Sequence, residues 1–229
     1  MKKIFLLALS LFLSLTMFAQ EKKYSEHYYE RYALFEQETP ITKYDIVLLG
    51  DSLTEGGDWS SYFPKTEAKL KKKGGAIRNR GIVGDTAEGI ADRLDQITPG
   101  QPYKLFFLCG ANDVSHNLSV DTIVVRIENV LCSIKEKSPK TKIYLQSMLP
   151  FNESFKRYKN LNGKTYMVAL INAELEKMAK RHKITFINLY PLFLEEGTEN
   201  LNPNITADGL HLKKEGYEIW SNAIAGYVK

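Results

Sequence analysis

The sequence contains little cysteine and no large excess of charge of one sign. Only two cysteines, Cys109 and Cys132, occur among 229 residues, which is too few for a disulfide framework. We expect both to be buried free thiols, with one disulfide between them as the alternative. The net charge is only +4, and the lysines are scattered except at positions 71–73, a run typical of a solvated helix end. Nucleic acid is therefore not an expected partner.

Internal repeats and low-complexity segments are also absent, and the one long apolar run stands at the N-terminus. Lys2 and Lys3 precede apolar residues 4–18, which are too few to span a membrane comfortably, and the small residue Ala19 follows. This pattern is typical of a cleaved secretory signal over residues 1–19, with an uncleaved anchor as the alternative. We expect residues 20–229 to form one exported domain, periplasmic or secreted from a bacterium, without stable membrane insertion.

The stretch 44–56 combines a strand pattern with a polar turn. The β-branched and leucine-rich residues 44–49 end at Gly50, and Asp51 and Ser52 follow directly. Ser52 is thus placed at the carboxyl end of a buried strand, where open α/β sheets bind ligands. The alternative is that Ser52 only caps the helix that follows.

Strand and helix patterns alternate along the rest of the chain. Strands are expected at 44–49, 76–79, 104–110, 142–149 and 184–189, with helices at 59–73, 90–98, 121–138, 165–182 and 213–229, and a short surface helix within 24–39. This alternation predicts a three-layer α/β/α, flavodoxin-like fold with a five-stranded parallel sheet in the order 2-1-3-4-5. Segments 151–164 and 191–207 are irregular, and whether they act as lids is left open.

Polar residues gather after strands one, two, three and five. A serine needs a base to act as a nucleophile, and histidine is suited to this role. Among the four histidines, only His211 has an acidic residue placed to orient its ring through one tight turn: Asp208, three positions earlier, with a glycine between them. The Ser52 amide, the Gly84 amide and the Asn112 side chain could form an oxyanion hole. Taken singly, Asp208 could be a turn cap, His211 a surface histidine and Gly84 a turn glycine.

Four short blocks of sequence carry a family resemblance. They are Gly50-Asp51-Ser52-Leu53, Gly84 within residues 80–85, Gly110-Ala111-Asn112-Asp113 and Asp208-Gly209-Leu210-His211. In order and spacing they resemble the signature blocks of the GDSL esterases, or SGNH hydrolases, and the similarity covers essentially the whole mature domain.

The resemblance implies a serine esterase without cofactor or metal. It makes Ser52 the nucleophile, His211 the general base, Asp208 its orienting acid, and Gly84 and Asn112 oxyanion donors beside the Ser52 amide. Thr54 replaces the second glycine of Gly-x-Ser-x-Gly, which disfavours an ordinary α/β-hydrolase. We expect Asp51, Asp85 and Asp113 to be structural residues that bond nearby backbone amides.

The expected activity is hydrolysis of small acyl esters, above all O-acetyl esters of a carbohydrate or glycan. The chain is similar to platelet-activating-factor acetylhydrolase subunits and bacterial carbohydrate acetylesterases, and aromatic residues near the expected rim could stack on sugar rings: Trp59, Tyr62, Phe151 and Tyr158. A lysophospholipase is the alternative substrate class, and a non-catalytic glycan-binding protein is the alternative of another kind. A homodimer is left open.

Overall fold

The computed structural model describes residues 23–229 and contains one parallel sheet. Its strands are β1 (Ile46–Gly50), β2 (Ile77–Gly81), β3 (Lys104–Leu108), β4 (Lys142–Gln146) and β5 (Thr185–Ile187). Their order is β2-β1-β3-β4-β5, and every neighbouring pair is parallel, as predicted. Since Gly50 pairs with both Gly81 and Leu108, β1, β2 and β3 end at the same level. The residues that follow these strands are thereby brought to one edge of the sheet.

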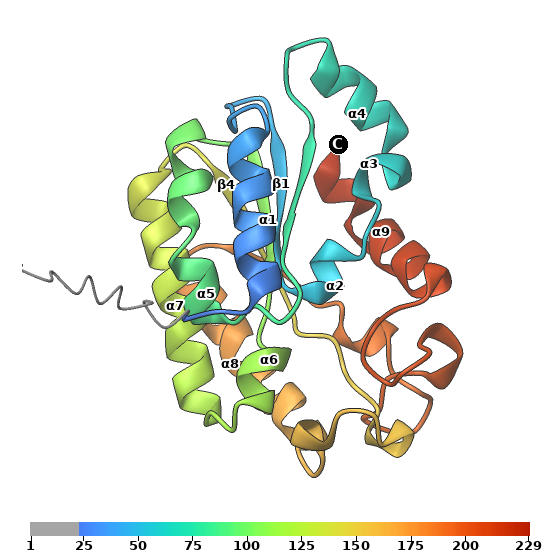
Figure 1. Cartoon of the computed structure of the whole chain (residues 1–229). Helices are drawn as coiled ribbons and strands as arrows, with labels where there is room; N and C mark the ends of the chain where they lie inside the picture. The colour runs from blue at the N-terminus through green and yellow to red at the C-terminus, as the bar shows by residue number, and fades with distance from the viewer. Residues whose placement is uncertain (1–22) are drawn as a thin grey trace, which may run out of the picture.

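Helices cover both faces of this sheet (Figure 1). They are α1 (Glu26–Gln37), α2 (Ser52–Glu55), α3 (Trp59–Tyr62), α4 (Pro64–Lys71), α5 (Ala87–Ala91), α6 (Ala111–Ser115), α7 (Val120–Lys137), α8 (Thr165–Arg181) and α9 (Lys214–Val228). The helices α5, α7 and α8 lie on one face, whereas α3, α4 and α9 lie on the other. No helix within residues 23–229 is long and apolar enough to cross a membrane.

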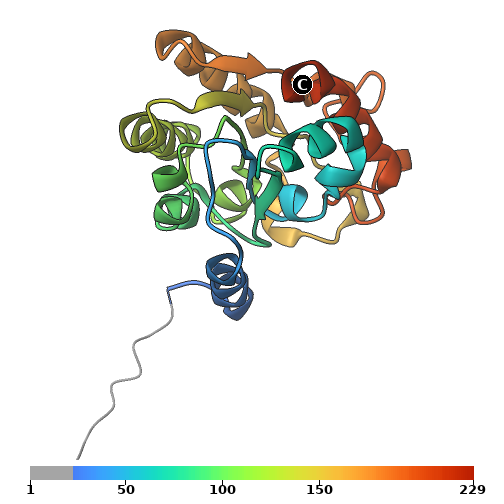
Figure 2. The same cartoon turned by 90° about the horizontal axis from the view of Figure 1, so that it is seen from above.

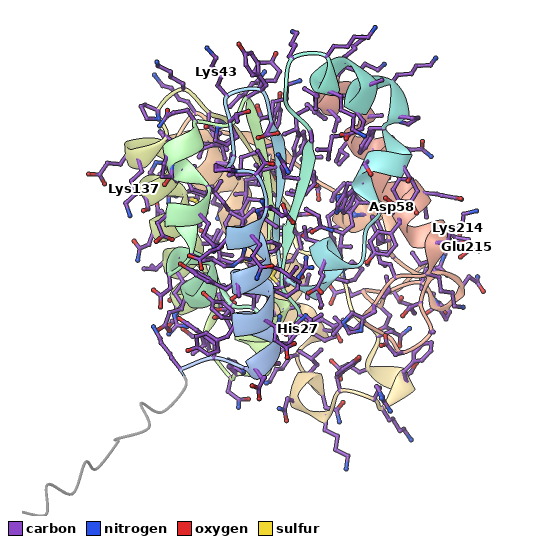
Figure 3. All side chains as sticks on the ribbon, turned by 45° about the horizontal axis from the view of Figure 1, so that its top comes forward. His27, Lys43, Asp58, Lys137, Lys214 and Glu215 are labelled. Carbon is purple, nitrogen blue, oxygen red and sulfur yellow. The ribbon has the colours of Figure 1, made fainter. Side chains whose placement is uncertain are left out.

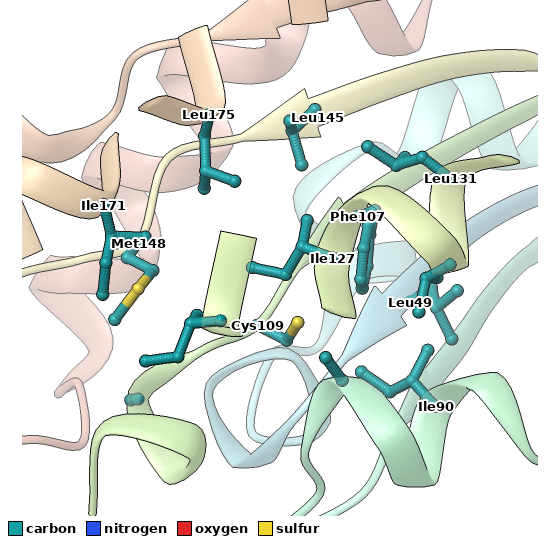
Figure 4. Close-up of a cluster of buried hydrophobic side chains, with 14 of the residues drawn as sticks. Leu49, Ile90, Phe107, Cys109, Ile127, Leu131, Leu145, Met148, Ile171 and Leu175 are labelled. Carbon is teal, nitrogen blue, oxygen red and sulfur yellow. The ribbon is translucent and has the colours of Figure 1, made fainter. Parts of the chain in front are cut away.

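Two clusters of buried apolar side chains hold these layers together. Figure 4 shows part of the first cluster, in which Ile127 of α7 lies beside Phe107 of β3 and Ile171 of α8 lies beside Met148. The second cluster joins Trp59 of α3 to Trp220 of α9, whose rings meet edge to face at 4.9 Å between centroids. The central strands β1 and β3 are buried along their whole length, so burial of apolar surface on both faces of the sheet stabilises its position.

The helix α1 lies outside the sheet, beside its β2 edge (Figure 2). Its Tyr28 and Phe35 pack with Ile82, which follows β2, and the Arg80 guanidinium of β2 stacks on the Phe35 ring at 4.4 Å. Covering an edge strand protects its unpaired backbone groups from pairing with another chain. The surface helix expected within 24–39 is therefore confirmed, and its position places it beside the loop that contains Gly84.

Two helices that the sequence predicts as single elements are divided in the structure. The segment 59–73 contains two helices, α3 and α4, because Pro64 begins the second one and cannot donate a backbone hydrogen bond. The segment 90–98 contains only the end of α5, followed by 3₁₀ turns at Leu94–Gln96 and Thr98–Gly100. There the backbone leaves the helical path at Arg93, whose side chain is fully buried.

The cysteine prediction is correct in part. Cys109 is a buried free thiol at the end of β3, where burial raises its pKa well above the usual value. Cys132 is also free, but it is exposed, so its predicted burial was wrong. The neighbours Val130, Leu131 and Ile134 face the core from α7, and Cys132 lies on the opposite side of that helix.

Candidate active site

Ser52 lies where the polypeptide leaves β1 and begins α2. The Asp51 side chain caps this helix by accepting the Leu53 N–H at 3.0 Å. Gly50 permits the sharp turn, because a Cβ atom there would approach the Leu108 carbonyl oxygen to 2.3 Å. Ser52 is thus the first residue of the helix, and its side chain is largely buried at the carboxyl edge of the sheet.

Asp208 and His211 lie in one tight turn before α9. The Asp208 Oδ1 atom accepts the N–H groups of Leu210 and His211 at 2.9 and 2.8 Å, which fixes the turn. The other oxygen, Oδ2, lies 2.8 Å from His211 Nδ1, and His211 Nε2 lies 3.0 Å from Ser52 Oγ. The structure therefore brings Ser52, His211 and Asp208 together in the order that the sequence predicts.

These contacts determine the charge of Asp208 and the tautomer of His211. Burial by itself raises the pKa of Asp208, but hydrogen bonds from His211, Leu210 and Tyr158 outweigh it and hold this pKa well below its usual range. An ionised carboxylate can only accept hydrogen bonds, so His211 Nδ1 carries the proton. His211 Nε2 is then an acceptor for the Ser52 hydroxyl.

Tyr158 is a member of this network that the sequence did not reveal. It belongs to the segment 151–164, which contains the 3₁₀ turns Glu153–Phe155 and Lys159–Leu161. Its hydroxyl donates to Asp208 Oδ2 at 2.7 Å and lies 3.0 Å from His211 Nδ1. Nothing in the sequence pairs Tyr158 with Asp208, because 50 positions separate them.

Gly84 occupies a turn directly after β2. The Asp85 N–H bonds the Ile82 carbonyl at 3.1 Å, and Gly84 has a φ of +79°, a backbone conformation that favours glycine. A Cβ added to Gly84 would have open space in front of it. Within residues 23–229 the Gly84 N–H has no hydrogen-bond partner, and the Ser52 N–H, at the first position of α2, has none within its helix.

Asn112 is the third predicted donor. It lies in α6, which follows β3, and its Nδ2 donates one hydrogen bond to the Asp85 carbonyl at 2.8 Å. An amide nitrogen has two N–H groups, so this bond leaves the second one free to donate elsewhere. Ser52, Gly84 and Asn112 line the same cavity, which agrees with the prediction that they converge.

The aspartates of the signature blocks lie beneath this site and contact backbone amides. Asp113 accepts the Ala87 N–H at 3.1 Å, and Asp85 accepts the Thr86 N–H at 3.0 Å. Asp85 also pairs with Arg93 at 2.8 Å, with both side chains fully buried. These contacts are of the structural kind predicted from the sequence.

Arg93 is a further residue that sequence reasoning missed. Its guanidinium donates to the carbonyl oxygens of Gly50 and Arg80 at 3.0 Å each, as well as to Asp85. It therefore ties the ends of β1 and β2 to the loop that contains Gly84. An arginine within a predicted helix gives no sequence signal of burial.

A cavity of about 440 Å³ opens beside Ser52 and His211. Its walls combine apolar and polar side chains, among them Val83, Ala111, Leu161, Leu210, Ser115, Arg157, Tyr158, Lys159 and Asn160. The expectation that four aromatic residues surround it was largely wrong. Trp59 and Phe151 are buried in the two apolar clusters and Tyr62 packs against the second, because aromatic side chains at helical spacing filled the core. Only Tyr158 lines the cavity.

The other three histidines lie away from Ser52. His27 pairs with Glu55, His182 pairs with Glu128, and His116 ends α6. Among residues 23–229, no cluster of three or more His, Cys, Asp or Glu side chains has the arrangement of a metal site. His211 is thus the histidine that contacts the candidate nucleophile.

A serine hydroxyl bonded to an acid-oriented imidazole, beside converging N–H donors at the carboxyl edge of a parallel sheet, is the arrangement of a hydrolase that acts by acyl transfer. The model of the GDSL-like Lipase/Acylhydrolase family matches residues 48–219. The chain belongs to this family and is a carboxylic ester hydrolase.

Solved structures share the fold. A GDSL-like lipase from Bacteroides thetaiotaomicron is 26% identical, with a TM-score of 0.70, over 88% of this chain and 96% of that one. A candidate platelet activating factor from Streptococcus pneumoniae is 23% identical, with a TM-score of 0.73, over 88% and 91%. An acetyl xylan esterase is 20% identical, with a TM-score of 0.64, over 81% and 100%. A search of curated proteins returned no significant match.

Proposed function

We propose that this protein is an exported serine esterase that removes small acyl groups, above all acetyl, from a carbohydrate. The observation that carries the proposal is the unbroken chain of contacts from Asp208 through His211 to Ser52, at a cavity that Gly84 and Asn112 also line. An isolated serine is a weak nucleophile, and this chain supplies the base and the orienting acid that it needs.

In the proposed acylation, Ser52 Oγ attacks the ester carbonyl carbon while His211 Nε2 accepts the hydroxyl proton. The N–H groups of Ser52 and Gly84 and the side-chain amide of Asn112 donate to the oxygen on which negative charge develops. His211 then passes its proton to the alkoxide of the leaving alcohol as the carbon–oxygen bond breaks. The products are the free alcohol and an acylated Ser52.

Deacylation repeats these steps with water. His211 takes a proton from the water that attacks the acyl carbon, and it returns this proton to Ser52 Oγ as the carboxylic acid leaves. Asp208 stays ionised throughout and stabilises the imidazolium that forms in each half-reaction. Each residue therefore acts twice, and Ser52 is regenerated.

The walls of the cavity support a carbohydrate as the leaving group. Arg157, Lys159, Asn160 and Ser115 offer hydrogen-bond donors to hydroxyl-rich groups. An acetyl xylan esterase has the same fold. We expect acetylated oligosaccharides to be better substrates than lysophospholipids, as measured by release of acetate or fatty acid at equal substrate concentration.

Comparison of the wild type with Ser52→Ala tests the catalytic proposal. The wild type should release acetate from p-nitrophenyl acetate and from acetylated xylo-oligosaccharides, whereas Ser52→Ala should lose at least about 10⁴-fold in kcat. Oligosaccharide binding without turnover in both proteins would indicate a glycan-binding protein. Preferential turnover of lysophospholipids would indicate a lipid-ester hydrolase.

Export is the second part of the proposal, and it depends on residues 1–19, which lie outside the described residues. Their short basic start and apolar run support a cleaved signal. Intact-mass analysis of the protein recovered from the periplasm or the medium should give a chain that begins at Gln20. A cell-associated chain that retains Met1 would contradict this part.

A further inference from the structure

Glu55 connects three segments near the Gly84 turn. It ends α2, three residues after Ser52, and its side chain is only 18% exposed. Its Oε2 atom accepts the Val83 N–H at 2.6 Å, while Oε1 lies 3.1 Å from His27 Nε2 and 3.5 Å from Arg31 Nε. A carboxylate can only accept, so His27 donates from Nε2. The carboxylate therefore bridges α1 and the turn that contains Gly84.

The turn over residues 82–85 determines where the Gly84 N–H lies. Gly84, with its φ of +79°, occupies the third position of a four-residue turn closed by the Asp85 N–H, which is type II geometry. Ser52 and Gly84 line the same cavity, so the distance between their N–H groups depends on where this turn is held relative to α2.

The two ends of the turn are held by contacts with β1, Arg93 and Asn112. The Ile82 N–H bonds the Gly50 carbonyl at 3.2 Å, and Asp85 is held by Arg93 and Asn112. Within the turn, the Val83 N–H bonds only Glu55 among the described residues. Glu55 belongs to α2, the helix that begins at Ser52, so this contact ties the residue before Gly84 to the helix that contains the Ser52 N–H.

We propose that Glu55 is a positioning residue that holds the Gly84 N–H in the oxyanion hole, and that α1 supports it through His27 and Arg31. This inference rests on the proposed esterase function. The helix α1 precedes residues 48–219, which the family model matches. His27 lies near the start of this helix (Figure 3), and Arg31 lies one turn further along and also stacks on Phe35 at 4.7 Å. The N-terminal helix thus contributes to catalysis without contacting the substrate.

Glu55→Ala tests the inference through kcat. Removal of the carboxylate releases the Val83 end of the turn from α2, so the Gly84 N–H is held less closely beside the Ser52 N–H, and kcat for p-nitrophenyl acetate should fall roughly 10- to 100-fold. The effect is smaller than loss of a donor because the N–H group remains. KM should change less than about 3-fold, since the contact acts on the transition state rather than on ground-state binding.

Glu55→Gln is the conservative variant. Its amide oxygen can still accept the Val83 N–H, so it should recover kcat to within about 5-fold of the wild type. The matched control is Glu38→Ala. Glu38 also pairs with two arginines beside α1, Arg80 at 2.9 Å and Arg78 at 3.7 Å, but among the described residues it has no contact with the turn. Its kcat should equal that of the wild type.

The outcomes separate this inference from the esterase proposal. Inactive wild-type protein would overturn the esterase proposal and the present inference with it. An active wild type together with an unchanged kcat in Glu55→Ala, or an equal loss in Glu38→Ala, would overturn the inference alone. Should Glu55→Ala fail to fold, Glu55→Asp serves instead, because it keeps the charge but is one methylene too short for the Val83 contact, and the same loss in kcat is expected.

Discussion

At the scale of single residues, Tyr158 and His211 share one carboxylate oxygen. Burial and the contact with Asp208 raise the pKa of Tyr158 to about 12, so its hydroxyl stays protonated and donates at neutral pH. This bond withdraws electron density from Asp208 Oδ2, which also faces His211 Nδ1. Tyr158 therefore weakens the electrostatic stabilisation that Asp208 gives to the protonated His211 ring.

Tyr158→Phe should move the acid limb of the pH–rate profile to higher pH. Without the phenol, Asp208 holds the protonated imidazole more firmly, and a protonated ring cannot accept the serine proton. We expect the acid limb of kcat/KM to shift by about 0.5 to 1 pH unit. A hydrogen bond to a charged group is worth about 1.5–3 kcal/mol, only part of which differs between the neutral and the protonated ring, and about 1.4 kcal/mol corresponds to one pH unit. An acid limb that is unmoved, or that moves to lower pH, would show that Tyr158 does not act on Asp208.

Asn112 gives a second prediction at this scale. Asn112→Ala removes the side-chain donor of the oxyanion hole, and kcat should fall roughly 100- to 1,000-fold. Initial rates on p-nitrophenyl acetate measure this loss, and circular dichroism checks that the variant still folds. The same kcat as the wild type would remove Asn112 from this role.

At the scale of elements, the sequence was most informative where apolar residues recur at regular intervals. The sheet order and the helices α7, α8 and α9 follow from apolar patterns, and the contacts among Ser52, Asp208 and His211 follow from their positions at strand ends. The divided helices did not follow, because apolar residues in 3₁₀ turns and short helices repeat at nearly helical intervals.

The contacts of Tyr158, Arg93 and Glu55 also could not be predicted. Each depends on a long-range contact with a backbone group or a carboxylate, and a pattern of local spacing contains no information about such partners. For the aromatic residues expected near the cavity, by contrast, the local sequence did contain the relevant signal. Trp59 and Phe151 have the spacing and neighbours of core residues, and the structure buries them accordingly.

Arg93 offers a test of how the elements around the site are joined. Arg93→Met keeps the length of the side chain but leaves the Asp85 carboxylate and two carbonyl groups without their buried donor. The free energy of unfolding should fall by about 3–5 kcal/mol, as expected when one partner of a buried ion pair is removed. Urea denaturation measures it.

Arg181→Met is the matched control for Arg93→Met. Arg181 is 57% exposed and pairs with Glu128 at 3.2 Å, so its loss should cost less than about 1 kcal/mol. Equal losses in the two variants would mean that Arg93 does not join β1, β2 and the Asp85 loop in the way described.

At the scale of the whole molecule, buried carboxylates beneath the site should make stability depend on pH. Burial, reinforced by Asp85 and Asp113, raises the pKa of Asp51 to about 7, although the Leu53 N–H opposes the shift. In the unfolded chain this pKa is about 4. Between these values the folded protein binds a proton that the unfolded chain has lost, so stability should fall as pH rises from about 4 to 7.

Asp51→Asn tests this linkage. The asparagine oxygen can still cap α2, but the amide does not titrate. We compare melting temperatures at pH 5 and pH 8, which lie on either side of a pKa of about 7. The fall in melting temperature between these two pH values should be smaller in the variant than in the wild type. Asp85 and Asp113, whose pKa values are also raised by burial, should leave part of the slope in the variant. Identical slopes in the two proteins would contradict the assignment to Asp51.

The contacts of Ser52 with His211 imply that Ser52 is an activated nucleophile. A small fluorophosphonate reacts with such a serine, and peptide mass spectrometry then identifies the labelled residue. We expect stoichiometric label on Ser52 in the wild type and loss of that label in His211→Ala, because the base that activates the hydroxyl is then missing. Folded wild-type protein that takes up no label, or that carries it on another serine, would mean that Ser52 is not the activated nucleophile.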